Sequence, residues 1–382
     1  MNPVIGILMA TNFVIGMGGF MVVGLLLPVA EDLSLSDAGA GWMMTSYALG
    51  YAVLSPLLVS ATGAVGRRRI LAIGVCVFAL AALICALAPG PSVLFAARVL
   101  AAAGAGIVTP VAASVAAGLS PPDRQARALA LVFSGMTLAQ VIGVPAGGWI
   151  AYTFGWRTAF LTVAVLALPT IWLIWTRVPA GLSFAPVSLT DLGRVLRNGT
   201  QMLAVGFTAV LMGAIYIVYT YLGPLLNDTF GYGRDGIAIA LIVFGVGAVL
   251  GNLAGGAVTD RIGPSRTLTI LCLSQMVIMP AFSALPVAES VLMALLLLWA
   301  LFGFSFMSAQ QVRLISLDPA QAPVFLALNA AAIYVGAAVG SAIGGAVILE
   351  FGLLYLGVSA GVVALAALGV LMLADRLLAR ST

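Results

Sequence analysis

Twelve runs of mostly apolar residues, each about 20 residues or longer, follow one another along the 382-residue chain. Hydrophobic residues make up 63% of the sequence and charged residues only 7%, whereas soluble proteins carry roughly 25% charged residues. Because a helix needs about 20 apolar residues to cross the hydrocarbon core of a bilayer, each run predicts one membrane-spanning helix. The alternating pattern of a membrane barrel is absent, so the sequence predicts an all-α membrane protein. The runs lie at about 4–30, 41–62, 70–88, 92–118, 127–151, 156–176, 201–226, 236–259, 267–285, 290–315, 323–349 and 353–374.

The sequence repeats itself loosely at an offset of 197 positions (340 − 143). Repetition at one spacing in so apolar a chain is typical of a duplicated membrane domain. We therefore expect two pseudo-symmetric six-helix halves, residues 1–177 and 200–382, joined by a cytoplasmic linker at 178–199 with a short surface helix near Leu189–Leu196. The offset relates Gly143–Gly148 to Gly340–Gly345, Phe154–Gly155 to Phe351–Gly352, and Gly66–Arg69 to Gly263–Arg266.

The 16 basic residues are all arginine, and their placement predicts the orientation of the chain. Arg157 and Arg234 lie on one side of the predicted spans and Arg98 lies within a span, while the remaining thirteen share the other side. The positive-inside rule then puts both termini in the cytoplasm. The net charge of +4 is accounted for by this topology and by lipid contact, so no nucleic-acid partner is expected.

The sequence offers little for metal or enzyme chemistry. Its three cysteines, Cys76, Cys85 and Cys272, all fall within apolar runs, and it has no histidine. We therefore expect no disulfide framework, no metal and no cofactor. An enzyme would need a nucleophile with a base nearby, and none is visible, so an enzyme is not expected.

Three segments carry a family resemblance. They are Ala126–Phe160 (ARALALVFSGMTLAQVIGVPAGGWIAYTFGWRTAF), Gly24–Leu33 (GLLLPVAEDL) and Tyr47–Pro56 (YALGYAVLSP). The chain resembles twelve-helix drug and sugar efflux permeases of the major facilitator superfamily, and most of all their arabinose-efflux-permease branch. This resemblance implies the major facilitator fold and transport across the cytoplasmic (inner) membrane of a bacterium.

The loop after the second span matches only part of the superfamily's cytoplasmic signature, Gly-x-Leu-x-Asp-Arg-x-Gly-Arg-Arg. Gly63 and Ala64 stand where the signature has its aspartate and first arginine, and only Arg67–Arg69 survive. The resemblance implies that Asp260 and Arg261, in the second copy, lock neighbouring helices in one conformation and release them in the other. Alternatively, these arginines only set the topology and face lipid phosphates. The second copy keeps Gly256, Asp260, Arg261, Gly263 and Arg266.

The fifth span resembles the family's antiporter motif at Gly143, Pro145, Gly147 and Gly148. Small residues let two helices approach closely, and proline removes one backbone hydrogen bond and allows a bend. We expect these four residues to act in gating. The alternative is that the glycines serve helix packing alone.

Arg98 lies about two turns into the fourth span, where a buried guanidinium costs roughly 2.5 to 3.5 kcal/mol unless it is paired or hydrated. Its position matches the family's arginine of that helix, which is often implicated in proton coupling. Efflux relatives commonly carry a carboxylate in the first span, but this chain has Gly18–Phe20 there. We therefore expect Asp32 or Glu31 to pair with Arg98 in one conformation. The alternative is that Arg98 snorkels to the outer surface or braces helices through backbone carbonyls.

Uncharged polar and aromatic residues within the spans are expected to line a cavity between the halves and to bind substrate. For each of them taken alone, packing between helices is the alternative. They are Asn12, Tyr47, Tyr51, Gln140, Tyr216, Tyr219, Asn252, Gln310, Asn329 and Tyr334.

These observations lead to one expected function. The chain is expected to be a secondary active transporter that exports small neutral or amphipathic molecules, such as sugars and drugs, by alternating access and proton antiport. Its expected partners are a small-molecule substrate, protons and the lipid bilayer, and it is expected to act as a monomer. An uncoupled facilitator of the same fold, or a non-transporting membrane sensor or enzyme, is the alternative.

Overall fold

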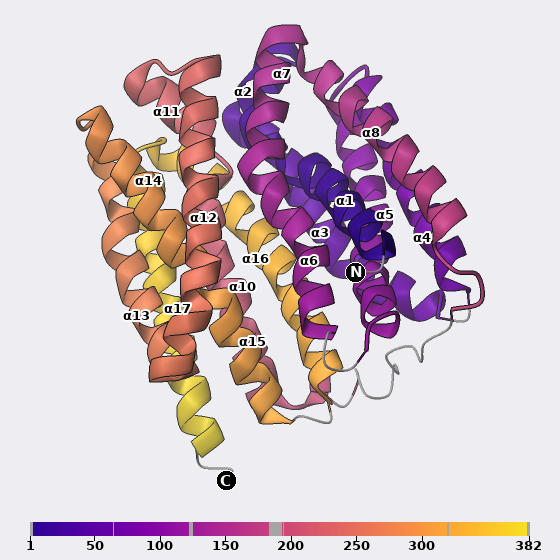
Figure 1. Ribbon diagram of the computed structural model, residues 1–382. Coiled ribbons are helices and arrows are strands. Elements are labelled where there is room, and N and C mark those ends of the chain that lie inside the picture. Colours follow the sequence, from indigo (N-terminus) through magenta and orange to yellow (C-terminus); the bar gives the residue numbers. More distant parts are fainter. Residues whose placement is uncertain are drawn as a thin grey trace. The chain divides into compact units, whose positions relative to one another are not determined.

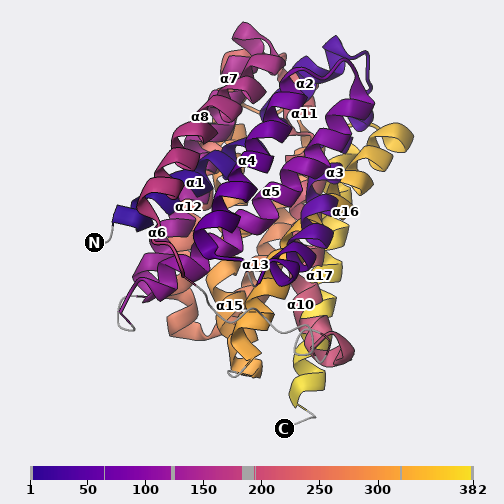
Figure 2. The ribbon, with the colours of Figure 1, turned by 90° about the vertical axis from the view of Figure 1, so that its right-hand side faces the viewer.

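The computed structural model describes residues 3–63, 65–121, 125–182, 193, 195–318 and 321–379. Within these ranges every regular element is helical, and twelve helical segments are long and apolar enough to cross a membrane. The twelve spans predicted from the sequence are confirmed one by one, with small shifts at their ends. Figures 1 and 2 show the helices from two directions.

The chain divides into two compact units. Unit 1 comprises residues 1–35 and 42–186, and unit 2 comprises residues 36–41 and 187–382. The surface helix predicted at Leu189–Leu196 lies mostly outside the described residues.

Unit 1 contains six spans, two of which are interrupted. The first span consists of two helices that meet at Met21, and the fifth contains a π-helical segment. The elements are α1 (Pro3–Phe20), α2 (Val22–Asp32), α3 (Asp37–Ala61), α4 (Arg67–Ala86), α5 (Pro91–Gly118), α6 (Gln125–Leu138), the π-helix η2 (Ala139–Gly143), α7 (Val144–Phe154) and α8 (Trp156–Arg177).

Unit 2 also contains six spans, three of which are built from two elements. Its elements are α10 (Gly199–Tyr219), α11 (Leu222–Phe230), α12 (Arg234–Ile262), α13 (Pro264–Ile278), the 3-10 helix η3 (Met279–Ala284), α14 (Glu289–Phe304), α15 (Phe306–Leu317), α16 (Ala322–Phe351) and α17 (Tyr355–Ala379).

The sequence repeat is visible in the backbone at one turn of each unit. Gly155 separates α7 from α8 with φ of +88°, and Gly352 separates α16 from α17 with φ of +95°. L-residues with a side chain rarely adopt this conformation, so glycine is needed at both turns. At the third repeated segment the turns differ, because Gly263 has φ of +84° and Gly66 has φ of −55°. The structure also places Arg67–Arg69 in the first turn of α4, whereas the sequence placed them in a loop.

Small residues set the helix packing within each unit. In unit 1, α4 packs against α5 and α8, and α1 packs against α6. In unit 2, α10 packs against α16 and α17, and α12 packs against α14. An added Cβ at Gly247, Gly251 or Gly255 of α12 would collide with backbone carbonyl oxygens of the neighbouring span. Glycine therefore lets these two helices approach closely.

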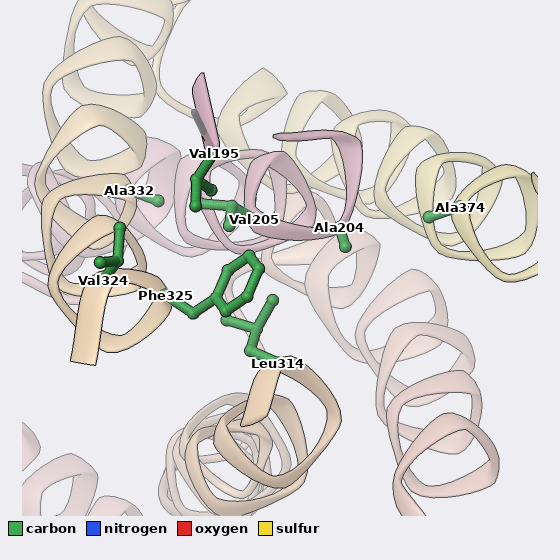
Figure 3. Close-up of a cluster of buried hydrophobic side chains, with 8 residues drawn as sticks. All are labelled: Val195, Ala204, Val205, Leu314, Val324, Phe325, Ala332 and Ala374. Carbon is green, nitrogen blue, oxygen red and sulfur yellow. The ribbon is translucent and has the colours of Figure 1, made fainter. Parts of the chain in front are cut away.

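An apolar cluster joins α10, α15 and α16 near one end of unit 2. Figure 3 shows Phe325 and Leu314 pointing toward one another beside Val205. Val195, which precedes α10, and Ala374 of α17 belong to the same cluster. The cluster ties the end of the linker to the helix bundle of this unit.

Candidate functional site

The most deeply buried cation in the described part of unit 1 lies at the break in the first span. Arg98 of α5 is only 1% exposed. Its Nη1 and Nη2 donate to the carbonyl oxygens of Gly18 and Gly19 at 2.6 and 2.7 Å, and its Nε donates to the carbonyl oxygen of Met43 at 3.2 Å. The guanidinium carbon lies 4.4 Å from the centre of the Tyr47 ring. Arg98 therefore braces α1, α3 and α5 through backbone acceptors and an aromatic face.

The local sequence explains why these acceptors are available. Gly18 and Gly19 lie in the last turn of α1, where carbonyl groups lose their usual helical donors. A Cβ at Gly19 would meet the Tyr47 hydroxyl at 2.9 Å, so a larger residue would displace the ring that stacks on Arg98. Gly18 and Gly19 thus supply two of the three backbone acceptors that hold the guanidinium.

The expected pairing of Arg98 with Asp32 or Glu31 is not found in this structure. Asp32 instead accepts hydrogen bonds from Arg157 Nη1 at 2.6 Å and Trp156 Nε1 at 3.0 Å. Gly19 and Asp32 are 13 residues apart (32 − 19) along α1 and α2, which corresponds to about 20 Å of helix. Glu31 is exposed in the same turn. Both carboxylates are therefore too far from Arg98 to pair with it here.

Asp32 and its partners instead join helix ends of unit 1. Arg157 Nη2 donates to the carbonyl oxygen of Ala88, which follows α4, at 3.2 Å. The Arg157 guanidinium also lies 4.3 Å from the centre of the Trp156 ring. The cluster joins the ends of α2, α4 and α8.

The segment that resembles the antiporter motif begins within a π-helical turn. Val144 N–H donates to the carbonyl oxygen of Ala139, five residues earlier, and the next residue is Pro145, which has no N–H. A π-helical turn of this kind is frequent at functional sites. Gln140 lies in this turn, and its Oε1 is buried without a hydrogen-bond partner in the structure.

The motif glycines face the first span. A Cβ at Gly143 would lie 3.0 Å from Met17 Cβ, and one at Gly147 would lie 2.8 Å from Met21 Cβ. Gly148 approaches the backbone of Gly24 in the same way. The motif thus packs along both sides of the break between α1 and α2.

Several predicted substrate-binding residues form hydrogen bonds that hold helices together, although Asn12 Oδ1 is buried without a hydrogen-bond partner. In unit 1, Asn12 is fully buried and its Nδ2 donates to the carbonyl oxygen of Val132 at 3.2 Å. In unit 2, Asn329 Oδ1 accepts a 2.6 Å hydrogen bond from the Thr208 hydroxyl. Gln310 Nε2 donates to the carbonyl oxygen of Ala204 at 2.9 Å. These contacts correspond to the packing role that the sequence left open for each residue.

The predicted tyrosines form an aromatic group in each unit. The ring centres of Tyr47 and Tyr51 lie 6.4 Å apart in unit 1. In unit 2 the ring centres of Tyr216 and Tyr219 lie 5.6 Å apart, and the Tyr219 ring stacks on that of Phe244 with 4.6 Å between their centres. Tyr334 of α16 is also buried, whereas Asn252 of α12 is exposed.

Phe244 and Trp299 extend the aromatic group of unit 2, and the sequence reasoning overlooked both. Their ring centres are 4.8 Å apart. Phe244 stands 197 positions after Tyr47 (244 − 47), so the repeat alone could have identified it. In unit 1 the Tyr47 ring contacts the guanidinium of Arg98, whereas in unit 2 the Phe244 ring, at the equivalent position of the repeat, contacts the indole of Trp299.

A buried arginine of unit 2 was interpreted from the sequence only as a topology signal. Arg313 of α15 donates through Nη2 and Nε to Asp375 Oδ1 of α17, at 2.6 and 3.0 Å. Its Nη1 donates to Gln310 Oε1 at 3.4 Å. The Arg313 side chain is 4% exposed and that of Asp375 is 33% exposed. Opposite charges near the same end of two predicted spans were the available signal for this pair.

The surviving aspartate of the cytoplasmic signature is not engaged within unit 2. Asp260 and Arg261 are both exposed in the last turn of α12. Among the described residues of unit 2, neither side chain has a hydrogen bond or an ion pair. A locking role for Asp260 and Arg261 stays a prediction.

Comparison with known proteins identifies the family. The sequence profile of the Major Facilitator Superfamily matches residues 8–322. The chain is 34% identical over 331 residues to the chloramphenicol resistance protein of Streptomyces lividans, covering 85% of this chain and 84% of the relative. It is 32% identical over 338 residues to the inner membrane transport protein YdhP of Escherichia coli K12, covering 88% and 86%.

A crystal structure of the nucleoside transporter NupG matches with a TM-score of 0.78 at 13% identity, covering 98% of this chain and 99% of that chain. At this level of identity the match supports the fold alone. The sequence profile and the identity to these two relatives, together with the twelve spans, show that the chain belongs to the Major Facilitator Superfamily of membrane transporters.

Proposed function

We propose that the protein exports small neutral or amphipathic molecules from a bacterial cell by alternating access. The observation that carries this proposal is the 34% identity to a protein named for chloramphenicol resistance, over 85% of the chain. The similarity to an inner membrane transport protein supports placement in the cytoplasmic membrane. The arginine bias supports cytoplasmic termini. We further propose that the protein acts as a monomer.

The chemistry of the buried groups supports a neutral substrate. The predicted binding residues are tyrosines, asparagines and glutamines, and Arg98 already has three backbone acceptors. Phenols and amides on an apolar wall suit solutes that combine an apolar body with a few hydrogen-bonding groups. Within this proposal, Tyr47, Tyr51, Tyr216 and Tyr219 are the principal contact residues.

Proton antiport is the proposed coupling mechanism, with Asp32 as the proton carrier. Asp32 combines a half-exposed carboxylate with a cationic partner, Arg157, so the pair can open and accept a proton. An uncoupled facilitator is the second candidate. It is favoured by the placement of the acidic residues, which in the described part of the chain lie in loops or near helix ends.

Transport by purified protein in liposomes tests the proposal. Radiolabelled chloramphenicol or a labelled neutral sugar is added outside the vesicles, and its uptake is measured with and without an imposed pH gradient. Vesicles preloaded with the unlabelled solute measure counterflow. Gradient-driven accumulation that a protonophore abolishes supports antiport. Counterflow that ignores the gradient supports the facilitator. Flux no faster than in protein-free vesicles, for both solutes, contradicts the proposed substrate class.

A further inference from the structure

Three arginines at one end of unit 1, Arg68, Arg69 and Arg177, have no acidic partner among the described residues. Arg68 and Arg69 lie in the first turn of α4, and Arg177 lies in the last turn of α8. The two helices pack side by side (Figure 1). Arg69 and Arg177 are exposed. Besides the buried Arg67 that begins α4, three cations therefore share one edge of the unit.

The charge balance of this end is unusual. In the described part of unit 1, the acidic residues are Glu31 and Asp32, which lie at the end of α2. Asp32 is already bonded to Arg157. The one further acidic residue in the sequence of this unit, Asp123, lies outside the described residues. In unit 2, by contrast, the buried Arg313 has Asp375 as its partner.

The backbone adds to the positive charge. The first turn of α4 holds no acidic residue, and its N-cap, Gly66, supplies no side-chain hydrogen bond. A helix N-terminus carries about half a positive charge, so arginines in the first turn are repelled and an anion is attracted. An anion held here would relieve both effects.

Arg68 is held in place with donor capacity to spare. Its guanidinium lies 4.9 Å from the centre of the Trp175 ring of α8. Its Nε is buried and has no hydrogen-bond partner in the structure. A guanidinium fixed on an aromatic face presents its remaining N–H groups in a plane that matches phosphate oxygens.

The surroundings point to a lipid rather than a free ion. Trp175 and Trp172 are 50% and 62% exposed, and exposed tryptophans are typical of the membrane interface. One turn after Arg69, Ile73 begins an exposed apolar stripe on α4 that continues to Leu80. A phosphate at the arginines would therefore place its acyl chains along apolar side chains.

We propose that Arg68, Arg69 and Arg177 bind the phosphate of an anionic phospholipid, with Trp175 positioning Arg68. The lipid phosphate supplies the negative charge that the described acidic residues of unit 1, both at the end of α2, do not offer at this end. Lipid binding at these arginines does not depend on the transported substrate.

Lipid titration of the purified protein tests the proposal. Binding of phosphatidylglycerol is measured by native mass spectrometry, with phosphatidylcholine of the same chain length as the neutral reference. Each arginine near a membrane surface contributes about 1 kcal/mol, so Arg68→Gln should weaken phosphatidylglycerol binding about fivefold. The triple variant Arg68→Gln, Arg69→Gln and Arg177→Gln should abolish the preference over phosphatidylcholine.

The matched control removes three exposed arginines from unit 2, as Arg197→Gln, Arg266→Gln and Arg376→Gln. This control should keep the preference. If both triple variants lose the preference for phosphatidylglycerol equally, the effect is one of general charge, and the proposed site is wrong. If inorganic phosphate protects the protein against thermal unfolding as well as phosphatidylglycerol does, the arginines bind a soluble anion, which would also overturn the proposal. If the triple variant does not fold, the phosphatidylglycerol affinity of Arg68→Gln tests the proposal by itself. The melting temperature of this variant in phosphatidylcholine checks that it is folded.

Discussion

Arg98 donates a 2.6 Å hydrogen bond from Nη1 to the carbonyl oxygen of Gly18, which brings the cation of α5 to the end of α1. Nη2 and Nε reach two further carbonyl oxygens, and the Tyr47 ring covers the guanidinium. Hydrogen bonds to charged groups contribute about 1.5 to 3 kcal/mol each. Backbone dipoles can therefore offset the burial of this arginine without a carboxylate.

Replacing Arg98 should destabilise unit 1 at the break in its first span. Arg98→Met leaves the carbonyl groups of Gly18 and Gly19 buried without donors, at about 1 to 3 kcal/mol for each group. Arg98→Lys should lose less, because a single ammonium can still reach some of these acceptors. Thermal unfolding in detergent, followed by size-exclusion chromatography, measures both variants.

Arg157→Met is the matched control for this prediction. Its side chain is 41% exposed, so water can replace its contacts. It should lower the melting temperature less than Arg98→Met. Equal melting temperatures for Arg98→Met and the unmodified protein would mean that the carbonyl contacts do not hold the break.

Hydropathy was sufficient to locate the spans because the bilayer sets their length and composition. It could not reveal the break at Met21, since the carbonyl groups of Gly18 and Gly19 find their donor on a helix about 80 residues away in the sequence. The burial of Arg98 was predictable from its position in an apolar run. The identity of its partners depended on tertiary packing.

The ion pair of Arg313 and Asp375 should show an unequal response to the loss of either partner. Asp375→Asn leaves a buried guanidinium without a counter-charge, whereas Arg313→Met leaves a carboxylate that is one-third exposed and can be hydrated. We therefore expect Asp375→Asn to be the more destabilising change. The double variant should recover part of the loss, and a double-mutant cycle on melting temperatures measures the coupling. Strict additivity would mean that the pair contributes no coupling.

The amides show the limit of reasoning from residue type. Asn12 and Gln310 were predicted to bind substrate because amides suit polar solutes, yet both donate to a carbonyl oxygen of a neighbouring helix. Their side chains have the same composition in either role. Only the position of the adjacent helix distinguishes the substrate-binding role from the packing role, and a local sequence pattern does not encode that position.

Gly135 should tolerate a methyl group less well than any motif glycine. An added Cβ there would collide with the carbonyl oxygen of Met9 and lie 3.0 Å from Phe13 N, both backbone atoms of α1. Overpacking of this kind costs about 1 to 3 kcal/mol. Gly6→Ala, with nothing within 4 Å, is the control and should be neutral or stabilising by up to about 1 kcal/mol. Equal melting temperatures for the two variants would contradict the close approach of α6 to α1.

Proton coupling should depend on Asp32 and on Arg98 in different ways. Asp32→Asn removes the proposed proton carrier, so accumulation driven by a pH gradient should disappear while substrate counterflow remains. Arg98→Gln should also reduce gradient-driven accumulation, but together with a lower melting temperature, because it disturbs the end of α1. Glu31→Gln, in the same exposed turn, is the control for Asp32→Asn and should keep coupling. Coupling that survives Asp32→Asn and fails in Glu31→Gln would transfer the role to Glu31, and coupling that survives both would exclude this end of α2 from proton transfer.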